Sequence, residues 1–160
     1  MLKFYDVENN YVRFLQTHDK RIPNVSETGN SKFLCGVVLA INGVDYYAPI
    51  SSNTNVYQTS YPIAGANGKI ISTIRFCFMF PAPLTVLTEK NFKQIRKINN
   101  PYADLLQKEW VNCRDNEKLI LNKALSVYNI GCNKEHKFNY TCCDFKLLEQ
   151  VFGNYQKKFG

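Results

Sequence analysis

The clearest pattern along the chain is a pair of apolar runs at residues 33–41 (FLCGVVLAI) and residues 44–50 (VDYYAPI). They flank the dipeptide Asn42-Gly43, which is a favoured loop for a two-residue β-hairpin because both positions tolerate a positive φ. The pattern therefore predicts two antiparallel strands joined by a tight turn.

Shorter strand-like runs accompany this hairpin in the first half of the chain. They occupy residues 2–5, 61–63, 69–80 and 84–87. The segments at residues 18–32 and 51–60 are polar loops, and long loops in compact domains are often functional.

Helical spacing dominates the second half. Helices are predicted there at residues 88–98, 101–128 and from Thr141 to residue 152, where Thr141 and Asp144 have the spacing of a capping box. One short helix is predicted in the first half, at residues 6–16. Because the strands precede most of the helices, we expect one α+β domain over residues 1–160. It should contain a twisted antiparallel sheet or small barrel, with helices mostly C-terminal.

The charge and the aromatic content favour an RNA partner. The formal net charge is +7, from 20 Lys and Arg against 13 Asp and Glu, and phosphate groups attract such a surface. Aromatic residues make up 14% of the chain. Most of them are expected in the core, but aromatic faces that reach the surface can stack unpaired bases.

Several other classes of protein lack support. The sequence has no phosphate-binding glycine loop, dinucleotide fingerprint or paired-carboxylate motif, as kinases, dehydrogenases and glycosidases would have. The N-terminal stretch has no signal-peptide pattern, and the most apolar segment, residues 70–87, is interrupted by Arg75, Pro81 and Pro83. With six cysteines and no secretory signal, we expect a cytoplasmic protein with reduced thiols and no contact with a membrane.

The hairpin has a register that can be counted back from its turn. The count pairs Ile41 with Val44, Leu39 with Tyr46, Val37 with Ala48 and Lys32 with Asn53. Pro49 cannot donate to a strand ladder, so a bulge or an edge is expected there.

This register brings Lys32 near Ser51, Ser52 and Asn53 at the open end of the hairpin, since opposed and diagonal neighbours lie about 5–8 Å apart. A lysine charge beside hydroxyl groups suits a phosphate group. The alternative is an ordinary solvated hairpin end.

A series of short motifs resembles one known family. In order they are K-F-Y, D-K-x-x-P-N, K-F-x-x-G-V-V-L-x-I-x-G and Y-x-A-P-[IL]-[ST]-S in the first third, then F-M-x-P at residues 78–81 and N-P-Y at residues 100–102. Together they resemble the ToxN/AbiQ family, the toxins of type III toxin–antitoxin systems, whose antitoxin is an RNA. Within the family the chain is most similar to CptN-type members.

The resemblance implies a sheet like that of MazF/Kid toxins with added helices. It also implies a metal-independent endoribonuclease without a cofactor, which cuts RNA at A-rich sites by attack of the ribose 2′-OH and leaves 2′,3′-cyclic phosphate and 5′-OH ends. The implied partners are target mRNA and a pseudoknot RNA antitoxin, cut by the toxin from a repetitive precursor and then bound in a closed protein–RNA assembly. The implied biological role is abortive infection, in which the toxin acts in phage-infected cells.

Carried over residue by residue, the active-site lysine of the family aligns with Lys32 and its hydroxyl pair with Ser51 and Ser52. Lys32 is expected to stabilise negative charge developing on phosphorus, and Ser52 to orient the 2′-OH and the phosphate. Thr28 stands where well-known members have a tyrosine, and Thr54 where they have a second lysine. Both are retained as candidate catalytic positions.

These two departures leave the proton carrier open among Tyr57, Lys69 and His18. The wider set of candidate RNA-binding residues is Asn53, Tyr57, Lys69, Lys20, Arg21, Lys93, Arg96 and Lys97.

Weaker signals suggest other sites. His18 and His136 are the only histidines and would form the pair of a histidine-dependent ribonuclease if the fold brought them together. A zinc site would need Cys132, His136, Cys142 and Cys143. The simpler interpretation is that these three cysteines are buried thiols. Cys35 and Cys77 are expected in the core.

Two competing functions remain. One is a non-catalytic RNA-binding module, which binds RNA in a salt-dependent way without cutting it. The other is a structural or protein-binding domain whose positive charge is incidental.

Overall fold

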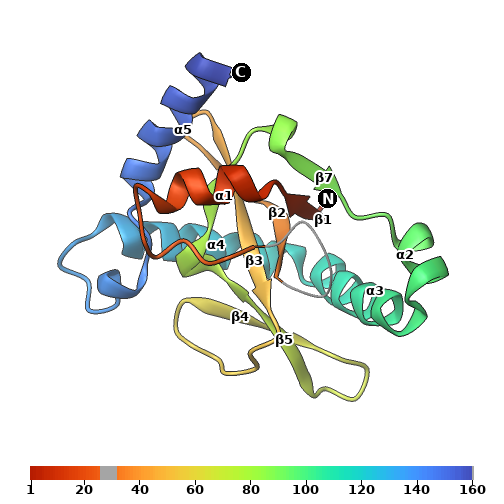
Figure 1. Cartoon of the computed structure of the whole chain (residues 1–160). Coiled ribbons are helices and arrows are strands. Elements are labelled where there is room, and N and C mark those ends of the chain that lie inside the picture. Colours follow the sequence, from red (N-terminus) through yellow and green to blue (C-terminus); the bar gives the residue numbers. More distant parts are fainter. Residues whose placement is uncertain (26–31, 160) are drawn as a thin grey trace.

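The computed structural model describes residues 1–25 and 32–159. Within these residues it contains a seven-stranded antiparallel sheet with the helices mostly C-terminal, so the predicted α+β class is confirmed (Figure 1). The strands are β1 (Lys3–Val7), β2 (Phe33–Ile41), β3 (Val44–Ser51), β4 (Ser60–Ala64), β5 (Ile70–Arg75), β6 (Phe80–Pro81) and β7 (Leu87–Glu89). The helices are α1 (Asn9–Gln16), α2 (Phe92–Ile98), α3 (Asn100–Asp115), α4 (Glu117–Cys132) and α5 (Phe145–Phe159), and the 3-10 turns are η1 (Phe76–Phe78), η2 (Leu84–Val86) and η3 (Asn139–Thr141).

The sheet is built around β3. The strand order is β4-β5-β3-β2-β1-β7, and β6 also pairs with β3. In Figure 1, α4 passes behind β3, and α1 lies in front of the sheet. The buried side chains of both helices therefore cover the hairpin strands that carry the candidate site.

The hairpin turn is confirmed, because Asn42 has φ 53° and Gly43 has φ 77°. The predicted pairs next to the turn, such as Leu39 with Tyr46, are also present. Beyond them the predicted register is wrong. A bulge lies between Gly36 and Leu39, so that Gly36 pairs with Tyr47, directly after the pair of Leu39 with Tyr46.

The bulge moves every later partner by two positions. Ala48 pairs with Cys35 instead of Val37, and Phe33 pairs with Ile50. Continuing this register by one residue sets Lys32 opposite Ser51, and not opposite Asn53. No bulge lies at Pro49, which pairs with Leu34 in a regular stretch. On the other side of β3, β5 pairs with Ile50 and Ser51 and β6 pairs with Tyr46 and Tyr47, so Pro49 stands at a local edge, as the second alternative predicted.

The predicted strand at residues 69–80 is interrupted. It leaves the sheet after Arg75, forms the turn η1, and returns to β3 as β6. Phe76 and Cys77 in this turn are both buried. In addition, the carbonyl of Cys77 accepts a hydrogen bond from the N–H of Cys143, so the C-terminal region takes the place of a strand.

The predicted helix at residues 101–128 is two helices that meet at Asn116. The Asn116 side chain donates to the carbonyl of Asn112 and closes the end of α3. Each helix keeps a buried face of its own, such as Leu106 on α3 and Ile120 on α4, and for that reason the apolar spacing seemed continuous.

Other helix ends also differ from the prediction. The last helix begins after Asp144, whose carboxylate accepts from the N–H of Leu147, while Thr141 belongs to η3. Helix α2 begins four residues later than predicted, after the cap Asn91, because residues 87–89 form strand β7. The first helix begins at Asn9, because Asp6 still belongs to β1.

Candidate functional site

A pocket of about 1190 Å³ opens where β3, β4 and β5 meet helix α4 and the turn η3. It exceeds the ~300–1,000 Å³ typical of small-molecule sites, which suits an extended ligand. Its cationic side chains are Lys32, Arg75 and Lys123, and its aromatic ones are Tyr57, Tyr61, Phe78, Phe138 and Tyr140. Among the residues that the structure describes, no carboxylate lines it.

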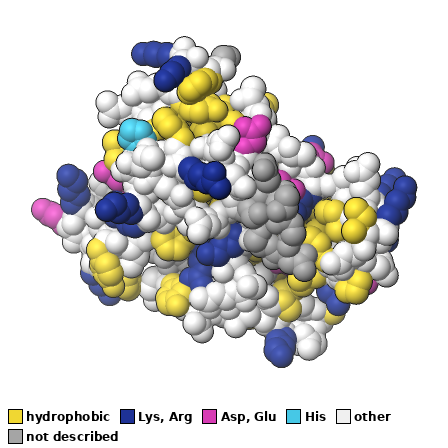
Figure 2. Space-filling model, in the orientation of Figure 1, with side chains coloured by type: hydrophobic (Ala, Val, Ile, Leu, Met, Phe, Trp, Pro, Cys, Tyr) yellow, Lys and Arg dark blue, Asp and Glu magenta, His cyan; other side chains and the backbone are white. Residues whose placement is uncertain are grey.

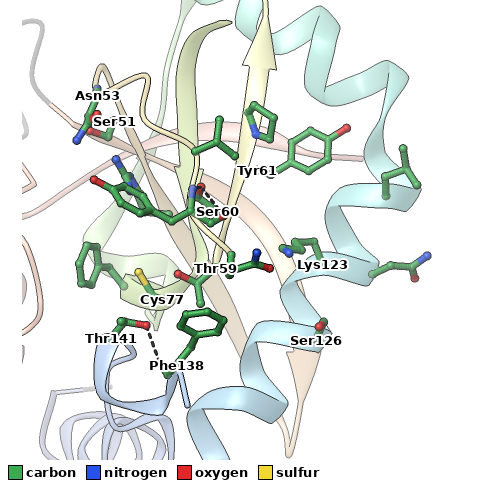
Figure 3. Close-up of a pocket in the computed structure, with 18 of the residues that line it drawn as sticks. Ser51, Asn53, Thr59, Ser60, Tyr61, Cys77, Lys123, Ser126, Phe138 and Thr141 are labelled. Carbon is green, nitrogen blue, oxygen red and sulfur yellow. Dashed lines mark hydrogen bonds between the residues drawn. The ribbon is translucent and has the colours of Figure 1, made fainter. Parts of the chain in front are cut away.

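The pocket is elongated. Figure 3 shows Ser51 and Asn53 at one end, Phe138 and Thr141 at the other, and Thr59, Ser60 and Cys77 between them. Tyr57 and Tyr140 are 50% and 74% exposed, so their rings are accessible for stacking. A positive, aromatic and elongated pocket is suited to single-stranded nucleic acid.

The sheet places the polar groups at the Ser51 end. Ser51 pairs with Thr73 on β5, and the register sets Lys32 on its other side, so these three residues form a row across neighbouring strands. Arg75 follows Thr73 by two positions and therefore points to the same face. Lys32 and Arg75 thus flank Ser51 on one face of the sheet.

The Ser51 hydroxyl is oriented by the loop that follows it. Its oxygen accepts a hydrogen bond of 3.2 Å from the N–H of Asn53. The side chain of Asn53 in turn accepts from the N–H of Asn55. With this lone pair occupied, the Ser51 proton remains available for an acceptor such as a phosphate oxygen.

The second half of the same loop holds Tyr57. The N–H of Tyr57 donates to the Ser60 hydroxyl oxygen at 3.0 Å, and the N–H of Ser60 donates to the carbonyl of Tyr57 at 3.2 Å. The Tyr57 ring is fixed over Arg75, whose guanidinium carbon lies 4.5 Å from the ring centroid. The loop therefore closes over a cation of the pocket.

The candidate residues divide into two groups. Lys32, Ser51, Asn53 and Tyr57 line the pocket. Ser52, Thr54, Lys69, Lys20, Arg21, Lys93, Arg96 and Lys97 are exposed outside its lining. Thr28 lies outside the described residues.

Two of the outlying cations are bound to carboxylates. Arg21 donates to Asp19 at 3.0 Å, and Arg96 donates to Asp104 at 2.6 Å. Although burial opposes it, hydrogen bonds from the backbone of Asp144 and from Arg21 keep the pKa of Asp19 below its ordinary value. The charge of Arg21 is therefore paired with that of Asp19 in the folded protein.

The histidine pair and the zinc set fall outside the pocket lining. The His18 ring packs edge-on against Phe14, and Nδ1 of His136 accepts from the N–H of Phe138. Within residues 1–25 and 32–159, no group of three or more His, Cys, Asp or Glu side chains is arranged to hold a metal ion.

The expected burial of Cys35, Cys77, Cys142 and Cys143 is confirmed, and Cys113 is buried as well. The same expectation is wrong for Cys132, which is exposed. Burial raises the pKa of Cys142 to about 11. A thiol that stays protonated at neutral pH is a poor nucleophile and a poor metal ligand.

Sequence reasoning missed Arg75, Lys123, Phe138 and Tyr140. Only Arg75 had a visible signal, as a single charge inside an apolar strand. The other three come from α4 and the segment around η3, which lie far from the hairpin in the sequence. Tertiary packing alone brings them to the pocket.

Comparisons with known proteins show the family of the chain. The family model described as "Toxin ToxN, type III toxin-antitoxin system" matches residues 3–153. The chain therefore belongs to the ToxN family of type III toxin–antitoxin toxins, as its motifs predicted. No described helix is long and apolar enough to cross a membrane.

Three relatives show how far the similarity extends. Endoribonuclease ToxN of Pectobacterium atrosepticum is 28% identical over 171 residues, which cover 98% of this chain and 95% of the relative. Endoribonuclease ToxN of Bacillus thuringiensis subsp. kurstaki is 25% identical over 165 residues, covering 98% and 85%. The solved structure described as "New insights into the mechanism of bacterial Type III toxin-antitoxin systems: selective toxin inhibition by a non-coding RNA pseudoknot" is 25% identical, with a TM-score of 0.90 over 98% of both chains. The predicted class, endoribonuclease, agrees with the names of the Pectobacterium and Bacillus relatives.

Proposed function

We propose that this protein is an endoribonuclease toxin that cuts single-stranded RNA in the pocket around Lys32 and Ser51. The observation that carries the proposal is the composition of the pocket: three cations, five aromatic rings and no carboxylate in the described lining. Such a surface attracts a phosphodiester and stacks its bases. Membership of the ToxN family supports the same activity.

The reaction is an attack of the ribose 2′-OH on the adjacent phosphorus. A bond forms between the 2′-oxygen and phosphorus, and the bond from phosphorus to the 5′-oxygen breaks. The proton of the 2′-OH leaves to a base, and the 5′-oxygen gains a proton. The products are a 2′,3′-cyclic phosphate and a 5′-OH end, and the step requires no metal.

Lys32 and Ser51 stabilise the charge that develops on the phosphoryl oxygens. The ammonium group supplies a positive charge, and the Ser51 hydroxyl supplies a hydrogen bond from a fixed position. Ser52 acts from the rim of the pocket, where it orients the RNA. Among the three candidates for the proton carrier, Tyr57 is the one that lines the pocket.

The inhibitor proposed for this toxin is a pseudoknot RNA. A relative of the same fold is inhibited selectively by a non-coding RNA pseudoknot, which supports the same type of antitoxin here. Many basic side chains and few acidic ones cover the face shown in Figure 2, and such a surface suits a folded RNA. Cutting of the antitoxin precursor, a closed protein–RNA assembly, A-rich cleavage sites, action in the cytoplasm against phage, and the CptN-type subfamily remain predictions from the sequence motifs.

Incubation of the purified protein with a labelled mRNA in excess EDTA tests the proposal. Discrete cuts with cyclic phosphate and 5′-OH ends are expected. RNA that is bound but stays intact would support the non-catalytic binding module instead. Cuts that appear only after Mg²⁺ is added would reject the metal-independent mechanism.

A further inference from the structure

We propose that Arg75 is a further catalytic residue of this ribonuclease, and that its guanidinium binds the scissile phosphate beside Lys32. The inference rests on the proposed function and adds a residue that neither the family motifs nor the hairpin register pointed to. Three observations carry it: burial without an anionic partner, a fixed orientation under Tyr57, and a place on the same sheet face as Ser51.

Arg75 differs from the other arginines of the chain in its burial. Arg75 is buried, with only 8% of the residue exposed, whereas the other four arginines, Arg13, Arg21, Arg96 and Arg114, are exposed. Arg21, Arg96 and Arg114 each lie within 3.0 Å of a carboxylate oxygen. Within the described chain, Arg75 has no carboxylate partner.

A buried charge without a partner is costly, so proteins seldom retain one unless it meets a ligand. Arg75 lines the pocket, which has no acidic residue in its described lining. The missing partner is therefore expected to be an anion that enters from solvent. In an RNA-cutting pocket that anion is a phosphate group.

Tyr57 fixes the guanidinium in a useful orientation. The ring covers one face of the planar group, with the guanidinium carbon 4.5 Å from the ring centroid. Stacking of this kind leaves the N–H donors at the edges free, and two of them can bind two phosphate oxygens at once. The paired bonds between Tyr57 and Ser60 hold the ring in place.

The sheet sets Arg75 at the correct end of the pocket. Ser51 pairs with Thr73, and Arg75 lies two residues further along β5 on the same face. A diagonal neighbour of this kind is about 7–8 Å away, within reach of an arginine side chain. A phosphate held at Ser51 would thus lie between the cations of Lys32 and Arg75.

The role follows from the change in charge during the reaction. As the 2′-oxygen bonds to phosphorus, negative charge accumulates on the phosphoryl oxygens until the 5′-oxygen leaves. A guanidinium keeps its proton in proteins, so Arg75 supplies hydrogen bonds and positive charge and does not transfer a proton. Arg75 therefore adds to the stabilisation of negative charge by Lys32. The proton transfers are carried out by other residues.

The test compares Arg75→Met with Arg114→Met. Arg114 is a matched control because it also lies over an aromatic ring, that of Trp110 at 5.3 Å, but outside the pocket. Three quantities are measured for each variant: single-turnover cleavage of RNA, salt dependence of binding to a 2′-O-methyl RNA that cannot be cut, and Tm. Arg75→Lys is added as the conservative variant.

For Arg75→Met we expect cleavage to fall roughly 100-fold. The slope of log binding constant against log salt should decrease by about 0.7, which corresponds to one lost phosphate contact on a single strand. The Tm should stay unchanged or rise, because an unpaired buried charge is removed. Arg75→Lys should recover part of the cleavage rate, and Arg114→Met should behave as wild type in cleavage and slope.

An unchanged salt slope in Arg75→Met would overturn the proposal, whether cleavage is normal or is lost together with a lower Tm. The binding measurement also separates this inference from the proposed function. If the wild-type protein binds RNA without cutting it, the catalytic part fails, and the slope still shows whether Arg75 holds a phosphate.

Discussion

The Thr73 hydroxyl donates a hydrogen bond of 2.8 Å to the carbonyl oxygen of Asn53. This bond joins the buried strand β5 to the loop that follows Ser51. Because the N–H of Asn53 donates to the Ser51 hydroxyl oxygen, the loop position and the Ser51 orientation are coupled.

Replacing Thr73 by valine removes this bond while keeping the shape of the side chain. Asn53 is exposed, so water can satisfy its freed carbonyl, and the free energy of unfolding should change by only about 1 kcal/mol. The RNA cleavage rate should fall by roughly 10-fold, since the Ser51 hydroxyl loses its fixed position. Single-turnover kinetics measure the rate, with Thr88→Val on the exposed part of β7 as the control. Equal rates for the two variants would disprove the coupling.

A buried carboxyl on α3 predicts a specific pH dependence of stability. Burial raises the pKa of Glu109 to about 7, against the opposing effects of a hydrogen bond from Ser72 at 2.6 Å and the charge of Lys90. The folded protein therefore binds this proton more tightly than the unfolded chain, whose ordinary value is 4.5. The contribution to the free energy of unfolding is complete below about pH 4.5 and is lost as the pH rises to about 7.

Glu109→Gln cannot ionise and can still accept the bond from Ser72. The fall in Tm between pH 5 and pH 8 should therefore be smaller in this variant than in wild type, by roughly 3–9 °C for about 1–3 kcal/mol. Thermal unfolding at pH 5 and pH 8 measures this change in Tm. Glu135→Gln, in an exposed loop, is the control. A Tm difference identical in wild type and Glu109→Gln would show that Glu109 does not titrate in this range.

Two helical glycines predict opposite effects of the same substitution. A Cβ at Gly153 in α5 meets nothing within 4 Å, so Gly153→Ala should raise the free energy of unfolding by about 0.5–1 kcal/mol through helix propensity. A Cβ at Gly131 in α4 would overlap the ring of the fully buried Phe145. Gly131→Ala should therefore lower the free energy of unfolding by about 1–3 kcal/mol.

Urea denaturation of the two alanine variants provides the comparison. The difference in sign is the essential result. Stabilisation of both variants would mean that Phe145 can move away from α4 without cost.

Local chemistry explains what the sequence predicted correctly. The turn at Asn42-Gly43 depends on two residues that tolerate positive φ, so its position could be read directly. The neighbourhood of Lys32 and Ser51 followed from that turn. A change of two positions in register kept both residues at the same end of the hairpin.

What the sequence did not predict depends on distant partners. The bulge in β2 accompanies the close packing of Gly36 against Tyr47, where a Cβ would overlap the ring. The break at Asn116 depends on a side-chain cap that apolar spacing does not reveal. The role proposed for Arg75 depends on the Tyr57 ring that covers it and on a described pocket lining without acidic side chains. Both are tertiary features that the sequence around Arg75 does not reveal.

The central claim is that RNA is cut in the pocket that contains Lys32. The most direct test is the single-turnover cleavage rate of Lys32→Ala in excess EDTA, beside Lys157→Ala, which removes an exposed lysine outside the pocket lining. We predict a loss of at least about 100-fold for Lys32→Ala and a wild-type rate for Lys157→Ala. Cleavage by Lys32→Ala at the wild-type rate would contradict the account and place the reaction elsewhere on the protein.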